Sequence, residues 1–209
     1  MGIICKLIRI VIWAALIYGG GRVTIPIPVV PITLQTCAVV FAGLVEGRAG
    51  GFMASLLYLL AGAAGWPVFA GGAGGMDYLT TAPSAGYLLA FPFGGYVAGG
   101  GARREGQSGS GLIRGLFFAA LAHAGILAGG MAGLIHTTGM EPEAALRIQI
   151  DLLPGGLIKS AAAAVLAALP VFSSGKTAHS RAGADPAPRN GEEDGEEGKE
   201  TGIPGEKPV

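Results

Sequence analysis

The sequence predicts an all-α integral membrane protein, a bundle of six transmembrane helices with both termini in the cytoplasm. Of its 209 residues, 51% are hydrophobic and only 13% are charged, whereas a soluble domain carries about 25% charged residues. Residues 1–172 divide into six apolar runs separated by Gly, Pro and charged residues. Lys and Arg gather on one side of the membrane that these runs would cross, which is the usual signature of the cytoplasmic face.

The apolar runs are the candidate membrane spans, and a membrane helix needs about 20 such residues, with a range of roughly 17 to 25. The last three runs are long enough, whereas the second and third are short. The turn between those two, 46–51, is too brief for a soluble domain, so we expect a helical hairpin. A buried helix pair of a soluble protein is the alternative, and the membrane-length runs nearby argue against it. The runs are 3–20, 34–45, 49–64, 85–102, 112–135 and 152–172.

The first run has Lys6 and Arg9 near its start, followed by a continuous apolar stretch. A secretory signal peptide has the same order of a basic start, an apolar middle and small residues. We favour a retained span, because five further apolar runs follow and the sequence contains no clear cleavage site.

The basic residues set the orientation. With a cytoplasmic N-terminus, the outer loops carry only Arg22 and Arg147. The outer face then receives the Pro-rich segment before Gln35 and the segments 65–84 and 136–151. The inner side carries Lys6, Arg9, Arg48, Arg103, Arg104, Arg114, Lys176 and Arg181.

The last segment, 173–209, differs from the rest in composition. It holds eight of the fourteen acidic and five of the fourteen basic residues, and almost no large apolar ones. Such a segment buries too little apolar surface to offset the entropy of ordering it. We therefore expect a membrane domain at 1–172 and a disordered, charged cytoplasmic tail at 173–209.

Two polar side chains stand within apolar runs. Gln35 heads the second run, and a buried amide without a hydrogen bond costs a few kcal/mol, so we expect a partner in the protein or a ligand. Lys159 follows Pro154, which suits a first helical turn, and would lie about one turn inside the sixth span. A cation near a helix N-terminus opposes the macrodipole, and a charge within a span indicates a functional site. The alternative is that Lys159 extends to the outer surface.

The sequence offers little for catalysis. The three histidines lack metal-ligand spacing, and His123 in the fifth run suits a satisfied helix-packing residue. No nucleophile elbow, zinc-protease motif or phosphate-binding loop occurs. We expect no enzyme activity, no catalytic residue, no metal, no cofactor and no nucleic-acid partner. The aromatic residues of the outer segment, including Phe69 and Tyr87, also fit an ordinary interfacial belt.

Four stretches carry a family resemblance: "IPIPVVPITLQTCAVVFAGLVEG", "YLLAGAAGWPVFAGGAGG", "APSAGYLLAF" and "LLPGGLIK". They resemble, in the same order, the signature blocks of the BioY family, the biotin-specific substrate-binding components of energy-coupling factor (ECF) transporters. The resemblance covers about 14–169. It implies a multi-pass protein of the cell membrane, surrounded by lipid, with biotin as its ligand. It also implies a transmembrane coupling subunit and a pair of ATPase subunits as partners.

Biotin carries a ureido group, an apolar thioether ring and a carboxylate, so its site needs polar partners at both ends of an apolar slot. The resemblance implies that Gln35, Lys159 and Tyr87 line that site. Ser84 keeps the hydroxyl of the family's Gly-Pro-Thr block, and Phe69 comes from the outer segment. The family's Asp before the Lys is replaced here by Gly156. The residues that could supply the missing carboxylate are Asp77 and Asp151.

The family also has a pair of alanines on its first helix, which here appears as Ala14 and Tyr18. A small pair survives in the next register, Ala15 and Gly19. Small residues let helices approach closely. This face is therefore expected to contact either the coupling subunit or a neighbouring helix of the same chain.

The sequence thus predicts a high-affinity biotin-binding subunit of an ECF vitamin importer, which captures biotin at the outer face. The alternative is a stand-alone facilitator or carrier for a small solute, and a membrane enzyme is a third reading. A transporter that pumps on its own would show a relay of charges across several spans. Only Lys159 is clearly intramembrane.

Overall fold

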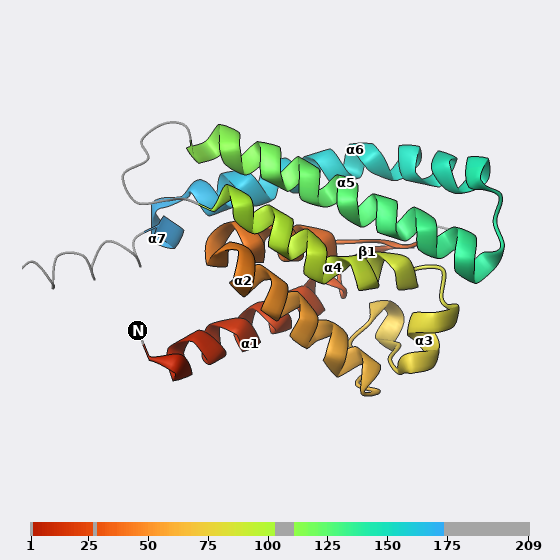
Figure 1. Cartoon of the computed structure of the whole chain (residues 1–209), viewed down its shortest axis with the longest axis horizontal. Helices are drawn as coiled ribbons and strands as arrows, with labels where there is room; N and C mark the ends of the chain where they lie inside the picture. The colour runs from red at the N-terminus through yellow and green to blue at the C-terminus, as the bar shows by residue number, and fades with distance from the viewer. Residues whose placement is uncertain (1, 27–28, 103–110, 174–209) are drawn as a thin grey trace, which may run out of the picture.

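The computed structural model of the chain describes residues 2–26, 29–102 and 111–173 and is mostly helical (Figure 1). Except for its first residue, the tail expected at 173–209 lies outside the described residues. Within the described part, four helices are long and apolar enough to cross a membrane. They are α1 (Ile3–Gly20), α2 (Gln35–Ala63), α5 (Gly111–Thr138) and α6 (Pro142–Ala168).

Shorter elements complete the bundle. The start of α1 and the last helix lie at the same, left-hand end in Figure 1, while α3 and the α5–α6 turn lie at the opposite end. The Pro-rich segment forms two short antiparallel strands, which the all-α expectation did not include. These elements are β1 (Thr24–Ile25), β2 (Ile32–Thr33), η1 (Ala70–Gly72), α3 (Met76–Thr81), α4 (Ala85–Ala98), η2 (Gly99–Gly101) and α7 (Pro170–Ser173).

Helix α2 is a hairpin of two helical arms that meet at Gly47. This glycine has φ 81° and ψ −177°, outside the helical region. A Cβ built on Gly51 would lie only 2.6 Å from the Cα of Gly43, although residues eight apart in a straight helix are separated by about 12 Å. The chain therefore reverses at Gly47, and the hairpin expected at 46–51 is confirmed.

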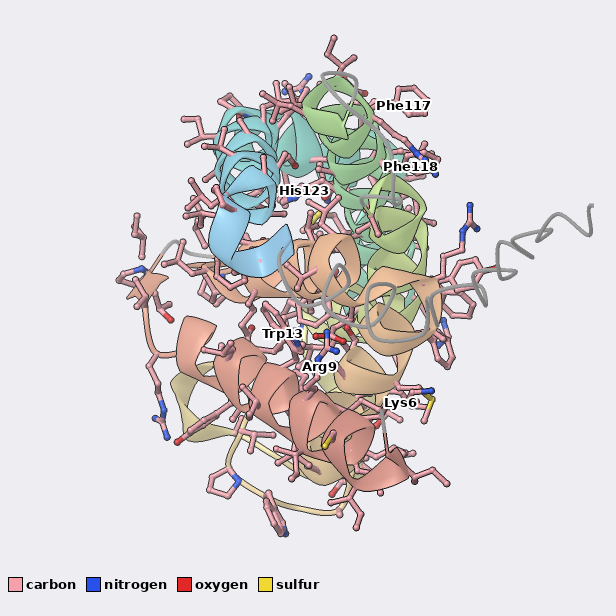
Figure 2. All side chains as sticks on the ribbon, turned by 90° about the vertical axis from the view of Figure 1, so that its left-hand side faces the viewer. Lys6, Arg9, Trp13, Phe117, Phe118 and His123 are labelled. Atoms are coloured by element: carbon pink, nitrogen blue, oxygen red, sulfur yellow. The ribbon has the colours of Figure 1, made fainter. Side chains whose placement is uncertain are left out.

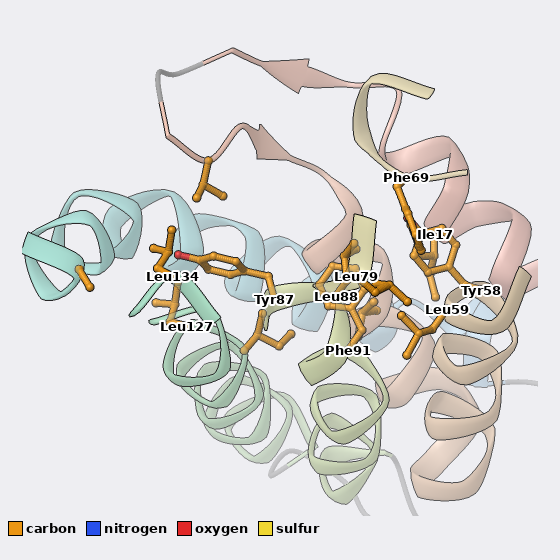
Figure 3. Close-up of a cluster of buried hydrophobic side chains, with 14 residues drawn as sticks. Ile17, Tyr58, Leu59, Phe69, Leu79, Tyr87, Leu88, Phe91, Leu127 and Leu134 are labelled. Carbon is orange, nitrogen blue, oxygen red and sulfur yellow. The ribbon is translucent and has the colours of Figure 1, made fainter. Parts of the chain in front are cut away.

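Helix α4 packs against this hairpin through glycines. A Cβ on Gly51 would lie 2.5 Å from the carbonyl oxygen of Gly95, so any larger residue would push the two backbones apart. Small residues permit this close approach between membrane helices. Beyond this contact, the helices enclose a buried aromatic cluster that includes Tyr58, Phe69 and Phe91 (Figure 3).

A polar contact attaches α1 to the turn of the hairpin. The Arg9 guanidinium pairs with Glu46 at 2.6 Å, and the Trp13 indole Nε1 donates to the same carboxylate oxygen at 2.7 Å. Figure 2 shows Arg9 and Trp13 together between α1 and α2. Glu46 thus accepts from two residues in the middle of α1 and attaches this helix to the turn of the hairpin.

The expected start of the sixth span is wrong. Helix α6 begins at Pro142, so the loop predicted at 136–151 shrinks to 139–141. Pro142 occupies the first helical turn, and Pro154 lies inside the helix. Lys159 is therefore well within α6, and the proposed opposition between its charge and the helix N-terminus does not apply.

Replacing Gly47 by Ala should lower the free energy of unfolding by roughly 1–3 kcal/mol, because an L-residue is strained at these angles. No atom lies within 4 Å of the added Cβ, so the cost is conformational rather than steric. Gly125→Ala is the matched control, since Gly125 is helical and its added Cβ also meets nothing within 4 Å. Thermal unfolding of both variants in detergent measures the difference, and equal melting temperatures would contradict the strain.

Candidate functional site

A pocket lies among the β2 segment, α2, η1, α4, α5 and α6. Much of its wall is apolar and includes Leu88, Phe91, Ile126, Leu127 and Leu152. Apolar walls with a few placed polar groups are typical of small-molecule sites. The polar residues of the lining are Thr33, Gln35, Thr36, Ser84, Tyr87, His123 and Lys159.

Gln35 begins α2 and is only 3% exposed. Its Nε2 donates to the Tyr58 hydroxyl, and its Oε1 accepts from the Thr33 hydroxyl at 3.3 Å. The Tyr58 hydroxyl in turn donates to the carbonyl of Val68 at 3.1 Å. The amide expected to need a partner is therefore held by the protein itself, in a fixed orientation at the pocket wall.

Lys159 points into the bundle. Its Nζ donates to the carbonyl oxygen of Thr33 at 3.3 Å, which places the ammonium beside β2 and the pocket. This geometry argues against extension to the membrane surface. Within the described residues the ion pairs are Arg9–Glu46 and Arg147–Glu143, and Lys159 belongs to neither.

Tyr87 is buried and contacts a residue that the sequence analysis missed. Its hydroxyl donates to Gln149 Oε1 at 2.8 Å, and Gln149 Nε2 donates to the Ala145 carbonyl at 3.2 Å. Gln149 is 7% exposed and lies in the first half of α6. An amide close to apolar residues was the signal that singled out Gln35, but 136–151 was interpreted as a loop.

Of the remaining predicted residues, two lie at or beside the pocket and two do not. Ser84 lines the pocket, and its hydroxyl lies 2.9 Å from that of Tyr78. Phe69 is buried beside the pocket, where its ring stacks on Tyr78 and meets Tyr58 edge-on. The two acidic residues are not brought to the site, because Asp77 and Asp151 are both exposed and outside the lining.

Three polar lining residues were not predicted as site residues: Thr33, whose hydroxyl donates to Gln35, and Thr36 and His123. Thr36 follows Gln35 at the start of α2, and His123 lies on α5 with 5% exposure. Neither Thr36 Oγ1 nor His123 Nδ1 has a hydrogen-bond partner in the described part of the chain. The sequence signal for His123 was an imidazole within an apolar run, which a packing role explained equally well.

The four residues expected to contact the coupling subunit form two pairs that differ in exposure. Ala14 and Tyr18 are half-buried and pack on the core. Ala15 and Gly19 are exposed, and a Cβ on Gly19 would meet nothing within 4 Å. The structure therefore packs the first pair within the chain and leaves the second pair on the outside of α1.

The long apolar helices and the pocket enclosed between them define a multi-pass helical membrane protein with a small-molecule site. The model of the BioY family matches residues 4–178. The chain belongs to the BioY family.

Relatives and a solved structure agree with this assignment. The chain is 37% identical over 142 residues to the biotin transporter BioY of Rhizobium etli, covering 66% of this chain and 75% of the relative. It is 41% identical over 90 residues to the probable biotin transporter BioY of Pyrococcus horikoshii, covering 43% of this chain and 55% of the relative. The crystal structure of an S-component for biotin from an ECF-type ABC transporter matches with a TM-score of 0.67 at 25% identity. That match covers 78% of this chain and 89% of the solved one.

Tyr87→Phe should lower the free energy of unfolding by about 1–3 kcal/mol, because it leaves the buried Gln149 oxygen without its donor. Tyr96→Phe is the control, since Tyr96 lies on the same helix with an exposed side chain. Exposed substitutions of this kind usually change stability by less than about 0.5 kcal/mol. Chemical or thermal unfolding in detergent compares the two, and equal losses would show that the Tyr87–Gln149 bond is not stabilising.

Proposed function

We propose that the chain is the high-affinity biotin-binding subunit of an ECF vitamin importer and captures biotin from the outer face of the membrane. The observation that carries the proposal is the pocket, whose largely apolar walls hold one ammonium group, one amide, one imidazole and several hydroxyl groups. Biotin needs an apolar slot for its thioether ring and polar partners for its ureido group and carboxylate. The relatives are named as biotin transporters, and the solved neighbour is described as an S-component for biotin.

We further propose six membrane crossings with both ends of the membrane domain, 1–172, in the cytoplasm. The crossings are α1, the two arms of α2, α4 with η2, α5 and α6. The start of α1 and helix α7 lie at the same end of the bundle in Figure 1, which is expected for an even number of crossings. The bias of Lys and Arg supports a cytoplasmic position for that end.

The proposed partners are a transmembrane coupling subunit and a pair of ATPase subunits. The exposed pair Ala15 and Gly19 would form the contact with the coupling subunit, because small residues allow two membrane helices to approach. Ala14 and Tyr18 pack on the core of the chain and would hold α1 in place for this contact.

Lys159→Ala should weaken biotin binding at least tenfold, or about 1.4 kcal/mol. A hydrogen bond to a charged group contributes about 1.5–3 kcal/mol, and the ammonium lies at the pocket wall. The empty protein should change little in stability, because loss of the hydrogen bond from Lys159 to the Thr33 carbonyl is offset by removal of a charge from within a span. Isothermal titration calorimetry in detergent measures the affinity, with the exposed Lys6→Ala as the control. Parent-like affinity of Lys159→Ala would exclude Lys159 from the site.

Gly19→Leu should leave biotin binding intact and impair biotin uptake in cells that also produce the coupling and ATPase subunits. A Cβ at position 19 has no atom of the chain within 4 Å, whereas the leucine side chain would obstruct an approaching helix. Gly125→Leu is the matched control, because Gly125 is also an exposed helical glycine with free space around it. Equal uptake by the two variants would argue against the α1 contact.

A further inference from the structure

His123 is a buried polar residue of the pocket that the proposed function does not yet explain. It lies on α5, is 5% exposed and lines the pocket together with Lys159 and Thr36. Figure 2 shows the labelled side chain between α5 and α6. Its Nδ1 is buried and has no hydrogen-bond partner among the described residues.

The ring is fitted closely to the facing helix. A Cβ built on Gly156 of α6 would lie 2.6 Å from both Cδ2 and Nε2 of His123. The imidazole therefore occupies the space that any larger residue at position 156 would fill. His123 and Gly156 are sterically matched, and the absence of a side chain at 156 allows the imidazole to sit at the pocket.

The unpaired polar atoms of the described interior converge on this pocket. Gln35, Ser55, Gln149 and Ser160 are equally buried, and each makes a hydrogen bond within the chain. The buried side-chain atoms without a partner are His123 Nδ1 and Thr36 Oγ1, and both residues line the pocket. Leaving a buried polar atom unpaired is unfavourable, so a ligand that pairs with these atoms gains affinity from doing so.

We propose that His123 and Thr36 contact the ligand directly and, with Lys159, bind the ureido group of biotin. This rests on the proposed function. A cyclic urea has one carbonyl oxygen, which accepts from the Lys159 ammonium, and two N–H groups. The neutral imidazole nitrogen and the threonine hydroxyl oxygen are acceptors for those two N–H groups. The apolar side chains Leu88, Phe91, Ile126 and Leu127 then surround the thioether ring.

A carboxylate at the same place uses the groups differently, because it has no N–H to donate. It would pair with Lys159 and require His123 and Thr36 to act as donors. The two arrangements can be separated with biotin methyl ester, which keeps the ureido group and lacks the negative charge.

The test compares His123→Phe with the parent, using biotin and biotin methyl ester in isothermal titration calorimetry in detergent. Phenylalanine keeps a planar ring against Gly156 and removes both nitrogens. The variant should bind both ligands about tenfold or more weakly, by a similar factor. The empty variant should unfold at the parent's temperature or above, because an unpaired polar atom has been removed. His136→Phe is the matched control, since His136 is exposed on the same helix, and it should bind as the parent does.

Three other outcomes would each overturn a different part of the proposal. Parent-like binding of biotin by His123→Phe overturns the contact. Weaker binding of biotin with unchanged binding of the ester places the carboxylate at His123 and overturns the ureido assignment. Failure of the parent to bind biotin overturns the proposed function itself. Thr36→Val supplies an independent arm if His123→Phe does not fold, because it removes a hydroxyl from a different helix and should weaken both ligands in the same way.

Discussion

The structure depends on one constraint, that a polar group inside an apolar bundle must find a partner within the protein or in a ligand. Glu46 meets this constraint by accepting from Arg9 and Trp13, and so attaches α1 to the hairpin. Gln35 meets it through Tyr58 and Thr33. The contacts of Glu46 with Arg9 and Trp13, and of Gln35 with Tyr58, join segments that are distant in sequence, so these polar contacts help to fix how the helices are placed relative to one another.

The glycine reversal at Gly47 determines where the pocket can form. The first arm of α2 spans only the residues from Gln35 to the reversal, about 18 Å at 1.5 Å per residue, which is well short of a hydrocarbon core of about 30 Å. If the arm crosses the membrane as proposed, it starts within the bundle rather than at its outer surface, beside β2, η1 and the pocket. The second apolar run was short in the sequence for this reason.

The apolar runs, the hairpin and the pocket residues Gln35 and Lys159 could be predicted, because composition, glycine and isolated polar residues are local signals. Tyr87 was assigned to the site only through the resemblance to the BioY family. The start of α6 could not be found in this way. Its first turns carry exposed polar residues such as Glu143 and Arg147, which pair with each other and resemble a loop in composition. The Tyr87–Gln149 bond joins residues 62 positions apart, and the fit of His123 to Gly156 depends on how α5 packs against α6. Neither contact has a local signature in the sequence.

The pocket and the C-terminal end of α1 are connected by direct contacts. A Cβ on Gly21, just after α1, would lie 2.6 Å from Gln35 Nε2, and one on Gly20 would lie 2.9 Å from the Leu34 backbone. The end of α1 thus has no free space between itself and the start of α2. Lys159 holds Thr33 of the adjoining strand, so the ammonium, β2, Gln35 and α1 form one continuous series of contacts. Packed interfaces of this kind shift as units rather than deform gradually. A ligand that pairs with Lys159 therefore binds a side chain that is connected, through β2 and Gln35, to α1, the helix whose exposed small residues are proposed to meet the coupling subunit.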